Sequence, residues 1–99
     1  VFATTSVSTA ETFLDTRSLF DVCTRADEAW VSFCNGYIQA AADVATLGGN
    51  ACIPNGVTRT RIASGFQEQI GVSLALDPVM GEESGIGIMV LYLSETYPC

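Results

Sequence analysis

Histidine and lysine are both absent from this chain of 99 residues. Histidine is the usual general base and the commonest metal ligand, and lysine supplies the amine of Schiff-base catalysis. Long apolar runs are also missing, since no stretch approaches the ~20 apolar residues that a bilayer-spanning helix needs. We therefore expect a protein that is not an enzyme, holds no metal or cofactor and has no membrane span.

Positive charge is scarce as well. Four arginines stand against eleven aspartates and glutamates, which gives a net charge of -7. Such a chain repels nucleic acid and anionic membrane surfaces and attracts basic partners. Because 48% of the residues are hydrophobic, the chain has the apolar content of a folded domain rather than of a disordered one. These proportions favour a protein partner and argue against nucleic acid.

Cysteine is present in an even number, at positions 23, 34, 52 and 99. There is no CxxC spacing and no histidine to complete a zinc site, so the cysteines favour disulfides formed in an oxidising compartment. The chain begins at Val1 without the basic and apolar regions of a signal peptide. The cysteines lead us to expect that such a peptide has been removed.

Apolar residues recur at helical spacing in four segments. The spacing predicts helices over residues 16–23, 27–47, 59–76 and 85–96. Residues 77–84 are predicted to form a loop or a weak helical turn, because the residue before Pro78 is pushed out of the helical region. We expect residues 1–12 to be a flexible arm and residues 13–99 to be a single domain.

Local signals mark the ends of these helices. Asp15 and Thr58 are predicted N-caps of the first and third helices, and Gly48 and Gly49 supply a left-handed stop after the second. In the third helix the predicted core stripe is Ile62, Phe66, Ile70 and Leu74. In the second helix it is Trp30, Phe33, Cys34, Tyr37, Ile38, Ala41, Val44 and Ala45.

Two features of the second helix need an interpretation. For the aromatic set Trp30, Phe33 and Tyr37 we favour core packing, with a partly exposed self-association surface as the alternative. Gly36 lies in mid-helix, where glycine costs up to ~1 kcal/mol relative to alanine. We therefore expect another helix to approach closely at Gly36.

The predicted architecture is all-α, a compact four-helix bundle with a short first helix. Short connections favour antiparallel neighbours, so the ends of the second and fourth helices meet at one pole. This topology pairs Cys52 with Cys99 and lets Cys23 and Cys34 join the first helix to the second. A Cys34–Cys52 bond is disfavoured because Cys34 lies ~20 Å from the end of its own helix, beyond disulfide reach.

The segment 77–84 (DPVMGEES) is the candidate binding surface. Its apolar residues stand among carboxylates, a combination that suits insertion into a basic cleft of a partner. The alternative, which we weigh equally, is that Val79 and Met80 cover the end of the bundle. The predicted partner-binding residues are Asp77, Val79, Met80, Glu82 and Glu83.

Four blocks of the sequence resemble the Rap/Tai family of type VI secretion immunity proteins. They are residues 19–23 (LFDVC), 33–38 (FCNGYI), 52–58 (CIPNGVT) and 97–99 (YPC). The resemblance covers residues 13–99 and implies a periplasmic, helical, often dimeric protein that blocks a peptidoglycan amidase effector. In the family's amidase-neutralising members the third helix and the loop between the last two helices occlude the effector's cleft, and here that loop is residues 77–84.

The leading hypothesis is therefore a periplasmic immunity protein whose partners are an amidase effector and a second copy of itself. An alternative is a periplasmic acid-stress chaperone of the HdeA type, since eleven carboxylates against four arginines give a large charge change on acidification. A structural or lipid-associated envelope protein ranks last, because the chain lacks an exposed amphipathic basic face.

Overall fold

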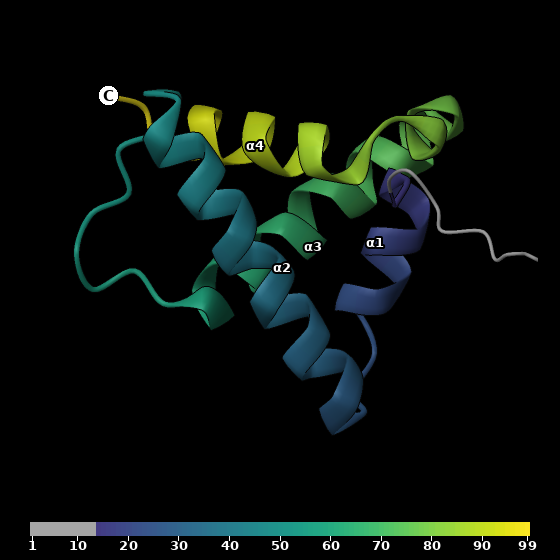
Figure 1. The fold of residues 1–99 in the computed structure, drawn as a ribbon. Helices are drawn as coiled ribbons and strands as arrows, with labels where there is room; N and C mark the ends of the chain where they lie inside the picture. The colour runs from purple at the N-terminus through teal and green to yellow at the C-terminus, as the bar shows by residue number, and fades with distance from the viewer. Residues whose placement is uncertain (1–13) are drawn as a thin grey trace, which may run out of the picture.

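The computed structural model describes residues 14–99, and the predicted arm of residues 1–12 lies outside them. Over the described range the prediction of an all-α fold is confirmed (Figure 1). The second helix begins one residue later than predicted, and a short 3-10 helix, η2, occupies the segment predicted to be a loop or weak turn. The elements are α1 (Thr16–Cys23), α2 (Glu28–Leu47), α3 (Arg59–Leu76), η2 (Pro78–Glu82) and α4 (Gly85–Thr96).

Side-chain caps begin three of the helices. The Asp15 carboxylate accepts a hydrogen bond of 2.8 Å from the backbone N–H of Ser18, and the Thr58 hydroxyl accepts one of 3.1 Å from Arg61. Both caps were predicted; Ser84, which caps α4 in the same way, was not. At the end of α2 the chain turns through Gly49, whose φ of 71° lies in the left-handed region that favours glycine.

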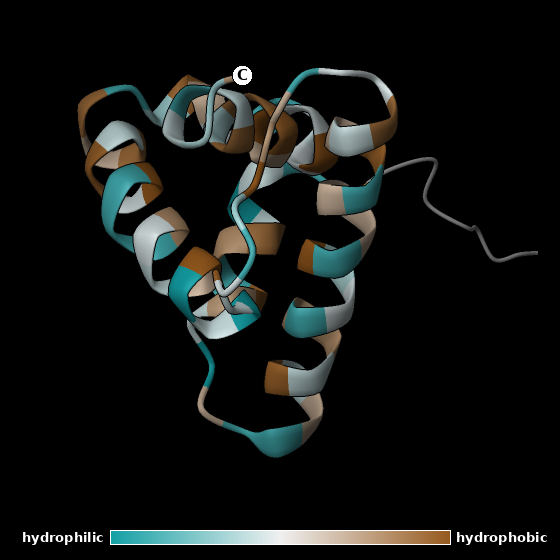
Figure 2. Ribbon diagram, turned by 90° about the vertical axis from the view of Figure 1, so that its left-hand side faces the viewer, coloured by the Kyte–Doolittle hydropathy of each residue, from teal (hydrophilic) through white to brown (hydrophobic). Residues whose placement is uncertain are grey.

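Helices α1, α2 and α4 form the three sides of a triangle, and α3 packs behind it. In Figure 1, α1 and α2 meet in the turn at the bottom of the view, α4 lies across the top, and α3 passes behind. Helix α4 contacts both α1 and α2, and α3 contacts α1, α2 and η2. Figure 2 shows hydrophobic and hydrophilic residues alternating along α2 and α3, the two long helices on the side that faces the viewer, as expected of helices that bury one side.

The core fills the space between these helices. All four predicted core residues of α3 are buried, and Phe66 packs edge-on against Tyr92 of α4 with ring centroids 5.8 Å apart. Burial of Tyr92 raises the pKa of its hydroxyl. Its hydroxyl also occupies the place that a side chain at position 65 would take, so the close approach of two helices occurs at Gly65.

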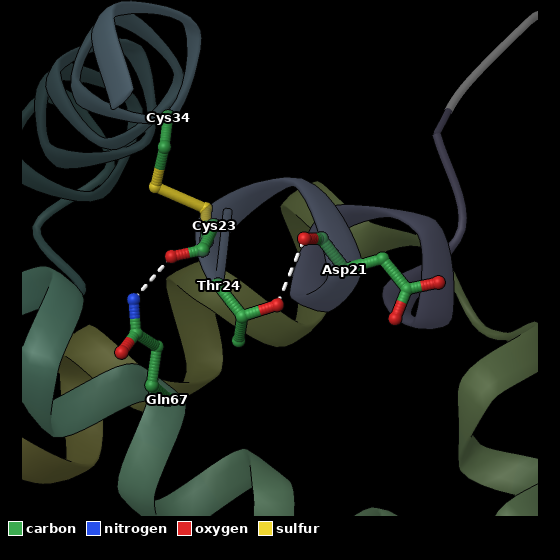
Figure 3. The surroundings of a disulfide bond; sticks show 5 residues. All are labelled: Asp21, Cys23, Thr24, Cys34 and Gln67. Atoms are coloured by element: carbon green, nitrogen blue, oxygen red, sulfur yellow. Dashed lines mark hydrogen bonds between the residues drawn. A yellow bond between two sulfur atoms is a disulfide. The ribbon is translucent and has the colours of Figure 1, made fainter. Parts of the chain in front are cut away.

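Two disulfides close the fold, and both predicted pairs are confirmed. Cys52 and Cys99, with Cα atoms 4.9 Å apart, join the loop after α2 to the end of α4. Cys23 and Cys34, with Cα atoms 5.1 Å apart, join α1 to α2. Beside the second bond the side-chain amide of Gln67 in α3 donates to the Cys23 carbonyl (Figure 3). The end of α1 is thus tied to both α2 and α3.

Two predictions about α2 are wrong. Trp30, Phe33 and Val44 are 36%, 45% and 51% exposed rather than buried, although Tyr37 is half-buried. Nothing lies within 4 Å of where a Cβ on Gly36 would be, so no helix approaches there. The Cys23–Cys34 disulfide explains why fewer residues of α2 are buried than predicted. Because Cys34 must face α1, the core includes only a narrow stripe of α2 on the side of Cys34.

The buried stripe of α2 consists of Cys34, Ile38, Ala41 and Ala45. The aromatic residues lie mainly on the neighbouring face. In addition, the first turns of α2 extend beyond the other helices (Figure 1), and the Trp30 ring contacts Phe33 and Arg25 and is not part of the core.

Candidate partner-binding surface

The η2 segment presents most of the predicted binding residues to solvent. Val79 is 66% exposed, and Asp77, Glu82 and Glu83 are also exposed. Met80 is half-buried and packs against the core. Each of the two interpretations that we weighed equally thus applies to one residue. Met80 covers the end of the bundle, and Val79 stays available to a partner.

The last two turns of α3, which lead into this segment, also expose apolar side chains that were not among the predicted binding residues. Val72 and Leu76 are 59% and 81% exposed and lie one turn apart on the same face. They were detectable in principle, because each falls two residues beyond a member of the buried stripe and therefore lies on the opposite side of the helix. We call Val72, Leu76, Val79 and the carboxylates of Asp77, Glu82 and Glu83 the α3–η2 patch.

The exposed residues of α2 form a second surface of different character. Trp30 and Phe33 meet edge-on with ring centroids 5.9 Å apart, and Phe33 stacks on Tyr37 at 6.2 Å. The Arg25 guanidinium lies 5.1 Å from the Trp30 ring centroid, within cation–π range. Partial burial of Tyr37 raises the pKa of its hydroxyl.

This second surface continues along the whole helix. Val44 and Leu47, the latter 89% exposed, follow the aromatic residues on the same side. We call this surface the α2 stripe and define it as Trp30, Phe33, Tyr37, Ala40, Val44 and Leu47. These positions are separated alternately by three and four residues, which is the spacing of a helix that packs along a partner helix.

Small hollows are present but are poor candidates for a small-molecule site. One, of about 180 Å³, lies beside the Cys23–Cys34 bond, and another, of about 200 Å³, lies between α2 and the loop that follows it. Ligand pockets commonly occupy ~300–1,000 Å³. Within residues 14–99 no three His, Cys, Asp or Glu residues are grouped to hold a metal ion.

A disulfide-bonded helical domain with two exposed apolar surfaces, one of them rimmed by carboxylates, has the features of a protein-binding module. No helix in the described part of the chain is long and apolar enough to cross a membrane. The family model of the Rap1a immunity proteins matches residues 15–99, and the chain belongs to this family. None of the curated proteins and none of the solved structures compared with the chain matches it.

Family membership confirms the predicted resemblance and indicates a role in immunity to a type VI secretion effector. Such a role implies that the protein binds its effector, and the family is not normally catalytic. The match therefore favours the immunity hypothesis over the acid-stress chaperone and the structural envelope protein.

Proposed function

We propose that this protein is a periplasmic immunity protein that binds and blocks a peptidoglycan amidase delivered by type VI secretion. The observation that carries the proposal is the exposure of Val79 between the carboxylates of Asp77 and Glu82 on the segment that connects α3 to α4. An apolar centre with a charged rim is the usual composition of a high-affinity protein interface.

The α3–η2 patch would block an active-site cleft by filling it. Val79 enters the cleft and loses its water, while Asp77, Glu82 and Glu83 face basic residues at the cleft margin. Burial of the apolar side chains supplies affinity, and the carboxylates set orientation and association rate. The chain carries a net charge of -7, which would also attract a basic effector over a distance.

The periplasm is the compartment that suits both the target and the structure. Peptidoglycan lies there, so an amidase is dangerous there. Disulfides persist in that compartment, and this fold has two of them, with all four cysteines paired.

Titration against purified amidase effectors, beginning with any encoded beside this chain, tests the proposal. We expect stoichiometric binding and loss of peptidoglycan hydrolysis. Val79→Arg should raise Kd by about 100-fold, because it places a charge at the centre of the interface. Leu91→Arg is the matched control, since Leu91 is an exposed apolar residue of α4. An unaltered chain that neither binds nor inhibits these amidases would exclude the proposal.

We also propose that the α2 stripe binds a second copy of the chain. Placed antiparallel about an axis between Ile38 and Gln39, two α2 helices bring Trp30 opposite Leu47, Phe33 opposite Val44 and Tyr37 opposite Ala40. Large residues then meet aliphatic ones at both ends. At the centre, Ala40 and the open face of Gly36 permit close approach.

Charge supports the same pairing. Residues 29–42 contain no acidic or basic side chain, so two copies with a net charge of -7 meet there with little local repulsion. The stripe is about 25 Å long, and a contact confined to one helix buries less than the ~800 Å² per partner of a standard interface. We therefore expect a weak dimer with a micromolar dissociation constant.

Sedimentation velocity over a range of protein concentrations tests this second proposal. We expect a reversible monomer–dimer equilibrium that Ala40→Arg abolishes, because the substitution puts two positive charges near the axis. A chain that stays monomeric at about 1 mM would exclude it.

A further inference from the structure

The first turn of α1 holds both ends of η2. The backbone N–H and the hydroxyl of Thr16 donate to the Glu83 carbonyl at 2.8 and 2.9 Å. The Arg17 guanidinium donates from Nη2 to the Pro78 carbonyl at 2.9 Å. Thr16 is fully buried. Two consecutive residues of α1 therefore fix the backbone at either side of Val79.

Gly81 lies between these two anchors, against the face of the Arg17 side chain. A Cβ at position 81 would come within 2.8 Å of Nη2 and 2.9 Å of Nε. Gly81 is buried and is not among the glycines with positive φ, which within residues 14–99 are Gly49 and Gly56. Its backbone conformation is thus open to any residue, and a side chain there would require the Arg17 guanidinium to move from its present position.

Helix formation does not explain an arginine at this position. The N-terminus of a helix carries partial positive charge, so a basic residue in the first turn is unfavourable. Arg59 and Arg61 also stand in the first turn of a helix, α3, so Arg17 is distinguished by what its side chain touches and not by its place in the helix. Arg17 is instead accounted for by its contacts with Pro78 and Gly81.

We infer that Arg17 and Gly81 are a positioning pair that holds η2 in its partner-binding conformation before the partner arrives. The inference rests on the proposed role of η2 in effector binding. A segment that is ordered in the free protein loses less conformational entropy on binding. Without the pair, η2 occupies the binding conformation only part of the time, and apparent affinity falls by that fraction.

Four variants test this inference: Arg17→Ala, Gly81→Ala, the double variant, and Arg61→Ala as a control for loss of one exposed positive charge. Hydrogen exchange of the free protein is the first readout. We expect Arg17→Ala and Gly81→Ala to speed exchange at residues 78–83 by about tenfold, with α2 unchanged. Arg61→Ala should have no effect.

Effector binding is the second readout. Arg17→Ala and Gly81→Ala should each raise Kd by about five- to tenfold, mainly through a slower association rate. Gly81→Ala should add nothing in the Arg17→Ala background, because the side chain with which its Cβ clashes has gone. Arg17→Lys, which keeps the charge but not the flat contact, should not restore binding.

Three results would overturn the inference. They are unchanged exchange at residues 78–83, additive effects in the double variant, and restored binding with Arg17→Lys, which would indicate a role for charge alone. Failure of the proposed function looks different. In that case the unaltered chain does not bind the amidase, while the exchange measurements still report whether Arg17 and Gly81 hold η2.

Discussion

The α3–η2 patch and the α2 stripe both expose apolar side chains, yet they differ in charge and in shape. Val72 and Val44, one from each surface, are 59% and 51% exposed. Three carboxylates accompany the patch, whereas the stripe is accompanied by one charge of each sign, Arg25 over the Trp30 ring and Asp43. The patch also ends in a short, anchored 3-10 helix, while the stripe is straight. Apolar exposure alone therefore does not identify the partner of a surface. The surrounding charges decide whether that partner is a basic protein or a second copy of the chain.

Exchanging valine for arginine on each surface should give the largest effects. Val72→Arg is expected to weaken amidase binding by about 100-fold and to leave self-association unchanged. Val44→Arg should abolish the dimer at micromolar concentration and change amidase affinity less than about threefold. In each case a buried contact is replaced by a solvated charge. Calorimetric titration and sedimentation velocity on both variants measure the two effects.

The two variants together test whether amidase binding and self-association use separate surfaces. A single variant that disrupts both activities, with an unchanged circular dichroism spectrum, would show that the two surfaces act as one. The proposed separation would then be wrong, even if each surface were functional.

Salt should affect the two surfaces differently. The association rate with a basic amidase is expected to fall by about tenfold between roughly 0.05 M and 0.5 M NaCl, because screening shortens the reach of the carboxylates. The dimer constant should stay within about twofold, since residues 29–42 are uncharged. Stopped-flow mixing and sedimentation at the two salt concentrations test this. Equal salt dependence of both reactions would contradict the assignment.

Much of the fold was predictable because its determinants are local. Three of the four helix ranges coincide with those predicted, and the caps Asp15 and Thr58 act through hydrogen bonds to residues three positions away. Both disulfides followed from the connectivity of the helices. The η2 segment could be recognised from its mixture of apolar and acidic residues, although its predicted contact residues remain a proposal.

The rest depended on contacts between distant residues. Helical periodicity showed that α2 has apolar residues on two adjacent faces, but it could not show which face the disulfide turns inward. The burial of Thr16 and the contact of Arg17 with Pro78 join positions more than 60 residues apart, with no local signal. The missed members of the patch, Val72 and Leu76, lie opposite a clear core stripe, where exposed apolar residues are easily dismissed.

Gly36→Ala should separate the stability of the chain from its self-association. No atom from another helix lies within 4 Å of the added Cβ, so the variant monomer should gain ~0.5–1 kcal/mol from better helix propensity. The dimer should weaken severalfold, because the added methyl groups separate the helices at the axis. Urea denaturation at low concentration and sedimentation at high concentration give the two values. A variant that is more stable and dimerises as before would exclude close approach at Gly36.

Acidification should act on the patch before the stripe, through the cap of α1. Hydrogen bonds from Ser18 hold the pKa of the Asp15 carboxyl below its ordinary value of 3.8. A carboxyl whose pKa is lowered on folding contributes stability that is complete above the unfolded pKa and is lost as the pH falls through the folded pKa. The next two residues, Thr16 and Arg17, hold η2, so loss of the cap should loosen η2 and leave α2 intact.

Hydrogen exchange at pH 5 and at about pH 3 should show faster opening at residues 78–83 only at the lower pH, after correction for the intrinsic rate. Asp15→Asn keeps an uncharged cap and should remove most of this pH dependence. Equal acid sensitivity of the variant would mean that another carboxylate is responsible.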